Sequence, residues 1–168
     1  SNVKGFTLIE LVVVIVILAI LAATVLPRFA EISDEAHRAS VQGTAGALGS
    51  AVALVKAQWT AIGAPGEVND GLRGFGRENV NVSSDGWPVS VAGGTDPTGV
   101  SADDCADLWE ALLQSNAPTV GTVANGEDYL ASLDGLDGND CRYTYQLDGE
   151  GNYIQYNPEE GEVFTEIN

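Results

Sequence analysis

Glu10 places a carboxylate at the start of an apolar segment, where a charge is energetically costly. Glu10 directly precedes an apolar run, residues 11–26, in which Thr24 is the only polar side chain. An ionisable group in a membrane segment costs several kcal/mol unless it is paired, and it is a functional candidate by default. The alternative is a carboxylate at the membrane interface that reaches water. The chemistry that these residues indicate is charge pairing.

The sequence offers little for catalysis or metal binding. It holds two cysteines, Cys105 and Cys141, and one histidine, whereas structural zinc normally takes four Cys or His ligands. No nucleophile, base and acid set and no phosphate-binding loop is found, so we expect no enzyme, no cofactor and no metal. The acidic segment 134–140 fails the ligand order of an EF-hand because Leu136 and Cys141 fall at ligand positions. Turn formation explains its residues better.

Charge divides the chain near residue 60. The 168 residues include 7 Lys and Arg against 24 Asp and Glu, a net charge of −17. Residues 1–60 hold four acids and four bases, so the whole negative charge falls on residues 61–168. A surface this negative repels phosphate backbones, and we therefore expect no nucleic-acid partner.

A long helix is expected to position Glu10. Counted from Phe6, the apolar run has 21 residues, enough to span the ~30 Å hydrocarbon core of a bilayer. It is apolar on all sides, which predicts a membrane helix rather than a buried core helix. Pro27 predicts a kink or local loss of helix near residues 23–27. A second apolar stripe at helical spacing continues the helix to about residue 62: Val41, Ala45, Leu48, Val52, Val55, Trp59 and Ile62.

The remaining residues predict a small sheet and one short helix. Short strands are expected at 79–83 and 87–91, and Ser101 with Asp104 predicts a capping box that opens a short helix. Alternating segments predict an antiparallel meander: 141–147, 152–156 and 162–167. Packed on the second stripe, this sheet gives an α+β domain, with the head covering the helix only from about residue 41.

The N-terminal motif Gly5-Phe6-Thr7-Leu8-Ile9-Glu10-Leu11, followed by the apolar run, resembles the class III signal of type IV pilins and pseudopilins. The resemblance implies that a membrane-embedded peptidase cuts between Gly5 and Phe6 and N-methylates Phe6. A secretory signal removed after the apolar run fits less well, because a charged helical segment follows directly. We expect Glu10 of one subunit to neutralise the Phe6 ammonium of a neighbour, since only that pairing favours assembly.

On this interpretation the residues of assembly are Phe6, Glu10 and Pro27. The chain then divides into a leader remnant (1–5), a transmembrane and filament-core helix (6–27), a continuing helix (28–62) and a globular acidic head (63–168). The precursor is expected in the inner membrane with its head in the periplasm, and the assembled subunit in an extracellular pilus.

Pieces of the head are similar to mannose-sensitive haemagglutinin (MSHA) type pilins. They are Asp85-Gly86-Trp87-Pro88-Val89, Cys105-x-x-Leu108-Trp109-x-x-Leu112-Leu113, Cys141-x-Tyr143-x-Tyr145, Ile154-x-Tyr156 and Gly161-x-Val163. Ala19 departs from the pattern, because many such pilins have Gly there. The resemblance implies the pilin fold and a major pilin for surface attachment and biofilm formation.

Export of the head favours a disulfide between Cys105 and Cys141, with two free buried thiols as the alternative. The disulfide would bound the C-terminal loop that such pilins expose. The expected partners are copies of the chain in a helical homopolymer, the prepilin peptidase, an assembly ATPase, a platform protein and a secretin. A type II secretion pseudopilin and a DNA-uptake pilin are the alternative functions.

Overall fold

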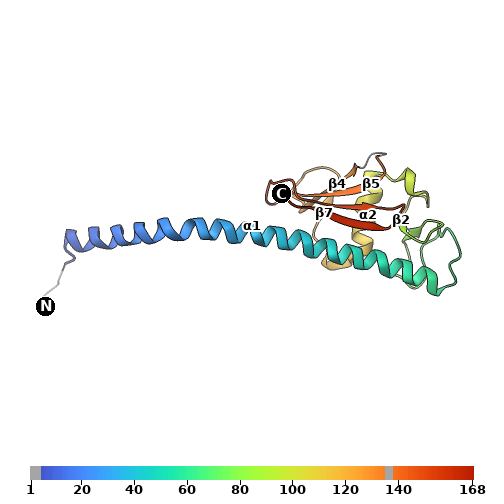
Figure 1. Cartoon of the computed structure of the whole chain (residues 1–168), viewed down its shortest axis with the longest axis horizontal. Helices are drawn as coiled ribbons and strands as arrows, with labels where there is room; N and C mark the ends of the chain where they lie inside the picture. The colour runs from blue at the N-terminus through green and yellow to red at the C-terminus, as the bar shows by residue number, and fades with distance from the viewer. Residues whose placement is uncertain (1–4, 135–137) are drawn as a thin grey trace. The chain divides into compact units, whose positions relative to one another are not determined.

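The computed structural model of the chain describes residues 5–134 and 138–168. Two compact units divide the chain, the first ending at His37 and the second running from Arg38 to Asn168. The helices and strands are α1 (Leu8–Ala61), β1 (Asn81–Val82), β2 (Pro88–Ser90), α2 (Ala102–Leu113), β3 (Val120–Gly121), β4 (Tyr129–Asp134), β5 (Asp140–Tyr145), β6 (Tyr153–Asn157) and β7 (Glu162–Glu166), with 3-10 turns at Pro97–Gly99 and Gln114–Asn116. Figure 1 labels α1, α2, β2, β4, β5 and β7.

The α1 helix continues through Pro27 without interruption. Of the kink or local loss of helix predicted near residues 23–27, the local loss is therefore wrong, whereas the kink stays a prediction. Proline removes one backbone donor, but the neighbouring residues keep their own helical hydrogen bonds and hold the helix together. Thr24 stays within the helix as well, since its Oγ1 donates to the Leu21 carbonyl at 2.9 Å.

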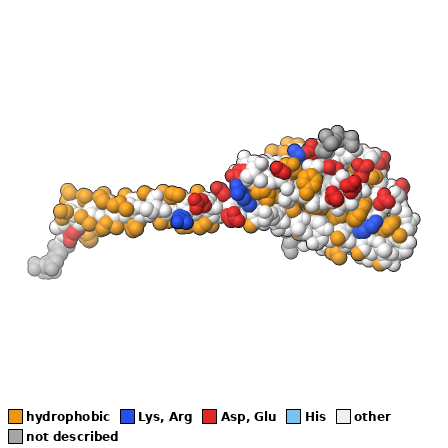
Figure 2. Space-filling view, in the orientation of Figure 1, with side chains coloured by type: hydrophobic (Ala, Val, Ile, Leu, Met, Phe, Trp, Pro, Cys, Tyr) orange, Lys and Arg blue, Asp and Glu red, His pale blue; other side chains and the backbone are white. Residues whose placement is uncertain are grey.

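The first unit is made up mostly of the N-terminal part of α1, and nearly all of its described residues are exposed. All described residues from 5 to 36 are exposed, and Figure 2 shows hydrophobic side chains along the visible face of this segment. Among the described residues, one helix, α1, is long and apolar enough to cross a membrane, and the apolar window within it is not buried at all. A core helix of a soluble protein would instead be mostly buried.

The second unit is the head, and its core begins on α1 at Val41. The second apolar stripe packs as predicted through Val55, and Trp59 is half-buried. Ile62 is an exception, because it lies beyond the helix end and is 43% exposed. Figure 1 shows the strands running alongside this part of α1, where the Cβ position of Gly49 would lie 3.8 Å from Val163 Cβ.

The main sheet has the strand order β3-β4-β5-β6-β7. The strands from β4 to β7 form the predicted antiparallel meander, with β4 as an additional strand. The sequence analysis missed β4 and also β3, which pairs with β4 in parallel. A two-stranded antiparallel sheet of β1 and β2 completes the head.

Aromatic rings fill the space between α2 and the sheet. The α2 helix begins with the predicted capping box of Ser101 and Asp104. Trp109 is fully buried, and its ring centroid lies 4.8 Å from that of Tyr129 and 4.5 Å from that of Tyr143. The Tyr143 hydroxyl donates to the Cys105 carbonyl at 2.8 Å. The α+β pilin architecture expected from the sequence is thus present.

These buried phenols predict a loss of stability at alkaline pH. Burial raises the pKa of Tyr129 from 10.0 to about 12 and raises the pKa of Tyr143 and Tyr156 as well. The folded head favours the neutral phenol, so this contribution is complete below pH ~10 and is lost as the pH rises towards 12. In detergent micelles, the melting temperature followed by circular dichroism should be level up to pH ~10 and then fall. A melting temperature that stays level to pH 12 would contradict this, and Tyr129→Phe should flatten the fall.

Position 86 must be glycine because the indole of Trp59 packs directly against it. Its φ is +80°, and a Cβ there would lie 2.4 Å from Cδ2 of Trp59, whose Nε1 donates to the Gly66 carbonyl at 2.8 Å. Gly86→Ala should lower the free energy of unfolding by about 2–4 kcal/mol, from backbone strain and overpacking together. Gly149→Ala is the matched control, since Gly149 has φ +70° and nothing within 4 Å of its Cβ position. If urea unfolding gives equal losses of unfolding free energy for Gly86→Ala and Gly149→Ala, the contact with the indole adds no cost.

Candidate assembly site

The start of α1 is a closed hydrogen-bonded unit. Thr7 is the residue before the helix, and its Oγ1 accepts from the Glu10 backbone N–H at 3.3 Å. Glu10 Oε2 in turn accepts from the Thr7 N–H at 2.9 Å and from Thr7 Oγ1 at 2.7 Å. This is a capping box, in which the side chains satisfy backbone donors that the helix leaves open. The sequence analysis missed Thr7, although the spacing Thr-x-x-Glu was its signal.

The capping box fixes where the Glu10 carboxylate can act. Oε2 takes both hydrogen bonds from Thr7, and in the described part of the chain no hydrogen bond reaches Oε1. Phe6, Ile9, Glu10, Val13 and Val14 line a shallow apolar hollow on the helix surface. The Phe6 side chain is 85% exposed. A carboxylate at the edge of an apolar surface is thus held in one place and keeps one oxygen open.

The predicted site residues are only partly brought together. Phe6 and Glu10 share the hollow, whereas Pro27 lies on the same helix about 25 Å further along, at 1.5 Å per residue. Gly5 is exposed, lies outside the helix, and has no neighbouring atom within 4 Å of its Cβ position. The Gly5–Phe6 bond is intact here, so the Phe6 nitrogen is an amide and its pairing with Glu10 stays a prediction.

The disulfide between Cys105 and Cys141 is present, and the alternative of two free thiols is wrong. The two Cα atoms lie 5.5 Å apart, and both cysteines are fully buried. The bond fastens α2 to β5, and the segment that it encloses contains β3 and β4. It therefore joins the head's short helix to the middle of its sheet.

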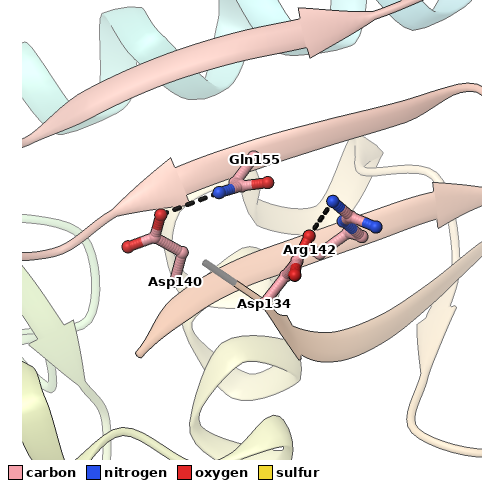
Figure 3. Close-up of polar contacts among 4 residues, drawn as sticks. All are labelled: Asp134, Asp140, Arg142 and Gln155. Carbon is pink, nitrogen blue, oxygen red and sulfur yellow. Dashed lines mark hydrogen bonds and ion pairs between the residues drawn. The ribbon is translucent and has the colours of Figure 1, made fainter. Parts of the chain in front are cut away.

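Polar contacts hold the two strand ends where the acidic segment 134–140 leaves the sheet, as Figure 3 shows. Asp134, at the end of β4, forms an ion pair with Arg142 on β5. Gln155 on β6 donates through Nε2 to Asp140 at 2.7 Å. Arg142 also lies over the ring of Tyr153, with Cζ 3.9 Å from the centroid. Residues 135–137, in the middle of the acidic segment that was compared with the EF-hand pattern, lie outside the described residues. Among those described, no group of three or more His, Cys, Asp or Glu side chains is placed to hold a metal ion.

Comparison with known proteins finds similarity in the N-terminal segment that contains this site. The prokaryotic N-terminal methylation motif matches residues 1–26. The chain is 53% identical over 55 residues to the type IV narrow pilus major component PilA5 of Thermus thermophilus. That match covers 33% of this chain and 47% of the relative, so it spans about half the length of the relative. No solved structure matches the chain.

The fold and the comparisons indicate the same class of protein. A long apolar N-terminal helix, a small antiparallel sheet and the disulfide between Cys105 and Cys141 match the pilin fold. The methylation motif and the similar pilus component support the type IV pilin family.

Proposed function

We propose that this chain is a structural subunit of a type IV pilus and polymerises through α1. The observation that carries the proposal is the segment 11–26, which is apolar on all sides, wholly exposed, and preceded by the capped Glu10 turn. Water does not tolerate a bare apolar surface of this size. The segment therefore lies in the inner membrane before assembly and against copies of itself afterwards.

Processing would prepare the subunit for assembly. A prepilin peptidase cuts after Gly5 and methylates the new terminal nitrogen of Phe6, as the matched motif supports. The exposed position of Gly5, ahead of the first helical residue, leaves its peptide bond accessible. Cleavage turns the Phe6 amide into an ammonium about one helical turn from Glu10.

The ammonium and the carboxylate then pair between subunits. Neither charge is stable alone in an apolar filament core, since an unpaired buried charge costs several kcal/mol. Glu10 Oε2 is already occupied by Thr7 within its own chain. The open Oε1 accepts from Phe6 of the neighbour, so each added subunit neutralises one pair of charges.

The finer proposal is a major pilin of the MSHA-like kind, used for surface attachment and biofilm formation. It is supported by the head motifs and by the disulfide that encloses the C-terminal loop. Its partners are other copies of the chain, the peptidase, an assembly ATPase, a platform protein and a secretin. The head faces the periplasm before assembly, and the role is structural rather than catalytic.

Electron microscopy of cells with and without the gene tests the proposal. Long surface filaments should be present in the parent cells, absent from the deletion, and restored by the intact gene. Antibody against the head should decorate the filaments along their length. Filaments that persist in the deletion, or that carry no label, would overturn the proposal. Short periplasmic fibres alone would favour the type II secretion pseudopilin.

A further inference from the structure

Two exposed arginines distinguish one loop of an otherwise acidic head. Arg73 and Arg77 are exposed, and neither forms an ion pair in the part of the chain that the structure describes. The other basic side chains of the head differ. Lys56 lies between two indoles, 4.5 and 4.6 Å from their centroids, Arg142 pairs with Asp134, and Arg38 is half-buried. Residues 71–78 are called the basic loop below.

The basic loop is held in one conformation by its own residues. Leu72 and Phe75, which alternate with the arginines, are buried in the core. The Leu72 N–H donates to the Val80 carbonyl at 2.8 Å, and the Glu78 N–H donates to the Phe75 carbonyl at 2.8 Å. Gln58 of α1 donates to the Arg73 carbonyl at 2.8 Å. The two guanidinium groups therefore extend from a rigid base, which lowers the entropy lost on binding.

A second exposed surface of the same head, an acidic turn, has a charge opposite to that of the basic loop. Residues 157–162, here called the acidic turn, join β6 to β7 and carry exposed Glu159, Glu160 and Glu162. Asn157 Oδ1 accepts from the backbone N–H groups of Glu159 and Glu160 at 2.8 and 3.2 Å. The Cβ position of Gly161 would lie 2.3 Å from the ring of Trp87, so the turn packs closely on that indole. This turn is also rigid.

Both surfaces lie near the C-terminal end of α1, yet they do not pair within one chain. The basic loop is joined to α1 through Gln58, and the acidic turn through Trp87 and Lys56. No ion pair joins the two among the described residues. When two different complementary surfaces meet one pair at a time, the contact is head-to-tail, and it repeats into an open helical polymer if the rotation between subunits does not close into a ring.

We propose that the basic loop of one subunit binds the acidic turn of a neighbouring copy, with Arg73 and Arg77 against Glu159 and Glu160. The inference rests on the proposed function, because it places this contact in the filament. Heads with a large negative charge repel one another, and a local pair of opposite charges fixes the register in which they can still touch. The acids of α2 serve as the comparison in the test below, because α2 lies beside the basic loop in its own head, with the Gly76 Cβ position 3.8 Å from the Ala111 carbonyl.

Charge exchange in the full chain tests the contact. Arg73→Glu with Arg77→Glu, or Glu159→Lys with Glu160→Lys, should each lower the yield of sheared filaments about tenfold. Combining all four substitutions should restore the yield to within about twofold of the wild type. As the matched control, Asp103→Lys with Asp107→Lys added to the arginine variant changes the same charge on the exposed side of α2 and should restore nothing. Equal melting temperatures of the heads confirm that every variant folds.

Cysteine cross-linking gives a second and independent measurement. The two native cysteines are already joined, so thiols introduced by Arg77→Cys and Glu160→Cys are the reactive ones. Mild oxidation of filaments should give a ladder of covalent oligomers on a non-reducing gel, whereas Arg77→Cys with Asp107→Cys should give none. No ladder and no rescue by charge exchange, in cells that still make wild-type filaments, overturns this contact alone. Absence of wild-type filaments overturns the proposed function and this contact with it.

Discussion

Filaments should disappear when Glu10 is replaced by valine, although the protein should remain in the membrane fraction. On the proposed pairing, the substitution would leave the Phe6 ammonium of the neighbouring subunit unpaired in an apolar surrounding, at a cost of several kcal/mol. Each 1.4 kcal/mol lowers an association constant tenfold, so the yield of sheared filaments should fall by at least roughly 100-fold. Immunoblots of the membrane and sheared fractions give both numbers from the same cells.

Two controls separate charge pairing from helix capping. Thr7→Ala removes the partner of Glu10 in the capping box and keeps its charge. Losing such a cap costs about 1 kcal/mol, so its effect on filament yield should be far smaller than that of Glu10→Val. Glu31→Gln removes an exposed acid of the same helix outside the apolar run and should leave the yield unchanged. Normal filaments from Glu10→Val would show that this carboxylate has only a capping role.

Removing the disulfide should destabilise the head more than any single surface change. The bond spans a sequence separation of 36 residues, and loop-closure entropy for a loop of this length is worth about 4 kcal/mol. Cys105→Ala with Cys141→Ala should therefore lower the free energy of unfolding by about that amount. For a head of this size the corresponding fall in melting temperature is on the order of 10–20 °C. Urea unfolding of the full chain in detergent, followed by tryptophan fluorescence, measures the loss.

Reduction of the wild-type protein is the matched comparison for that variant. Dithiothreitol breaks the same bond without changing the side-chain volume in the core, so the reduced protein and the double alanine variant should differ only by the cavity that the variant leaves. A loss below about 1 kcal/mol in both proteins would show that the bond contributes little to the stability of the head. Filament yield should fall with head stability, because unfolded heads are removed by proteases.

The helical part of the fold follows from spacing alone. The stripe that starts at Val41 predicts which side of α1 is buried, since helical periodicity needs no knowledge of the partner. Pro27 misleads because a single proline lowers helix stability without deciding the outcome when long helical segments flank it. The β4 strand escapes notice because its inward residues, Tyr129 and Ala131, alternate over only a short distance.

The assembly site is predictable in part for a different reason. Glu10 stands out because a charge beside an apolar run is costly wherever the chain folds. Its hydrogen-bond partner Thr7 is close in sequence as well. Thr7 was overlooked because Glu10 was considered only as a charge for pairing between subunits, although its carboxylate also caps the helix. The rigidity of the basic loop is not visible in the sequence, because it depends on Gln58, Val80 and other residues brought together by the folded head.

The contact between Gly49 on α1 and Val163 on β7 sets an order of events during synthesis. A ribosome makes the apolar helix well before the last strand of the sheet, so the core around α1 cannot close until β7 has been made. Throughout that time the N-terminal segment already needs an apolar solvent. On the proposed function, the membrane receives the helix while the head is still unfolded, and the head folds afterwards on a chain that is already tethered to the bilayer.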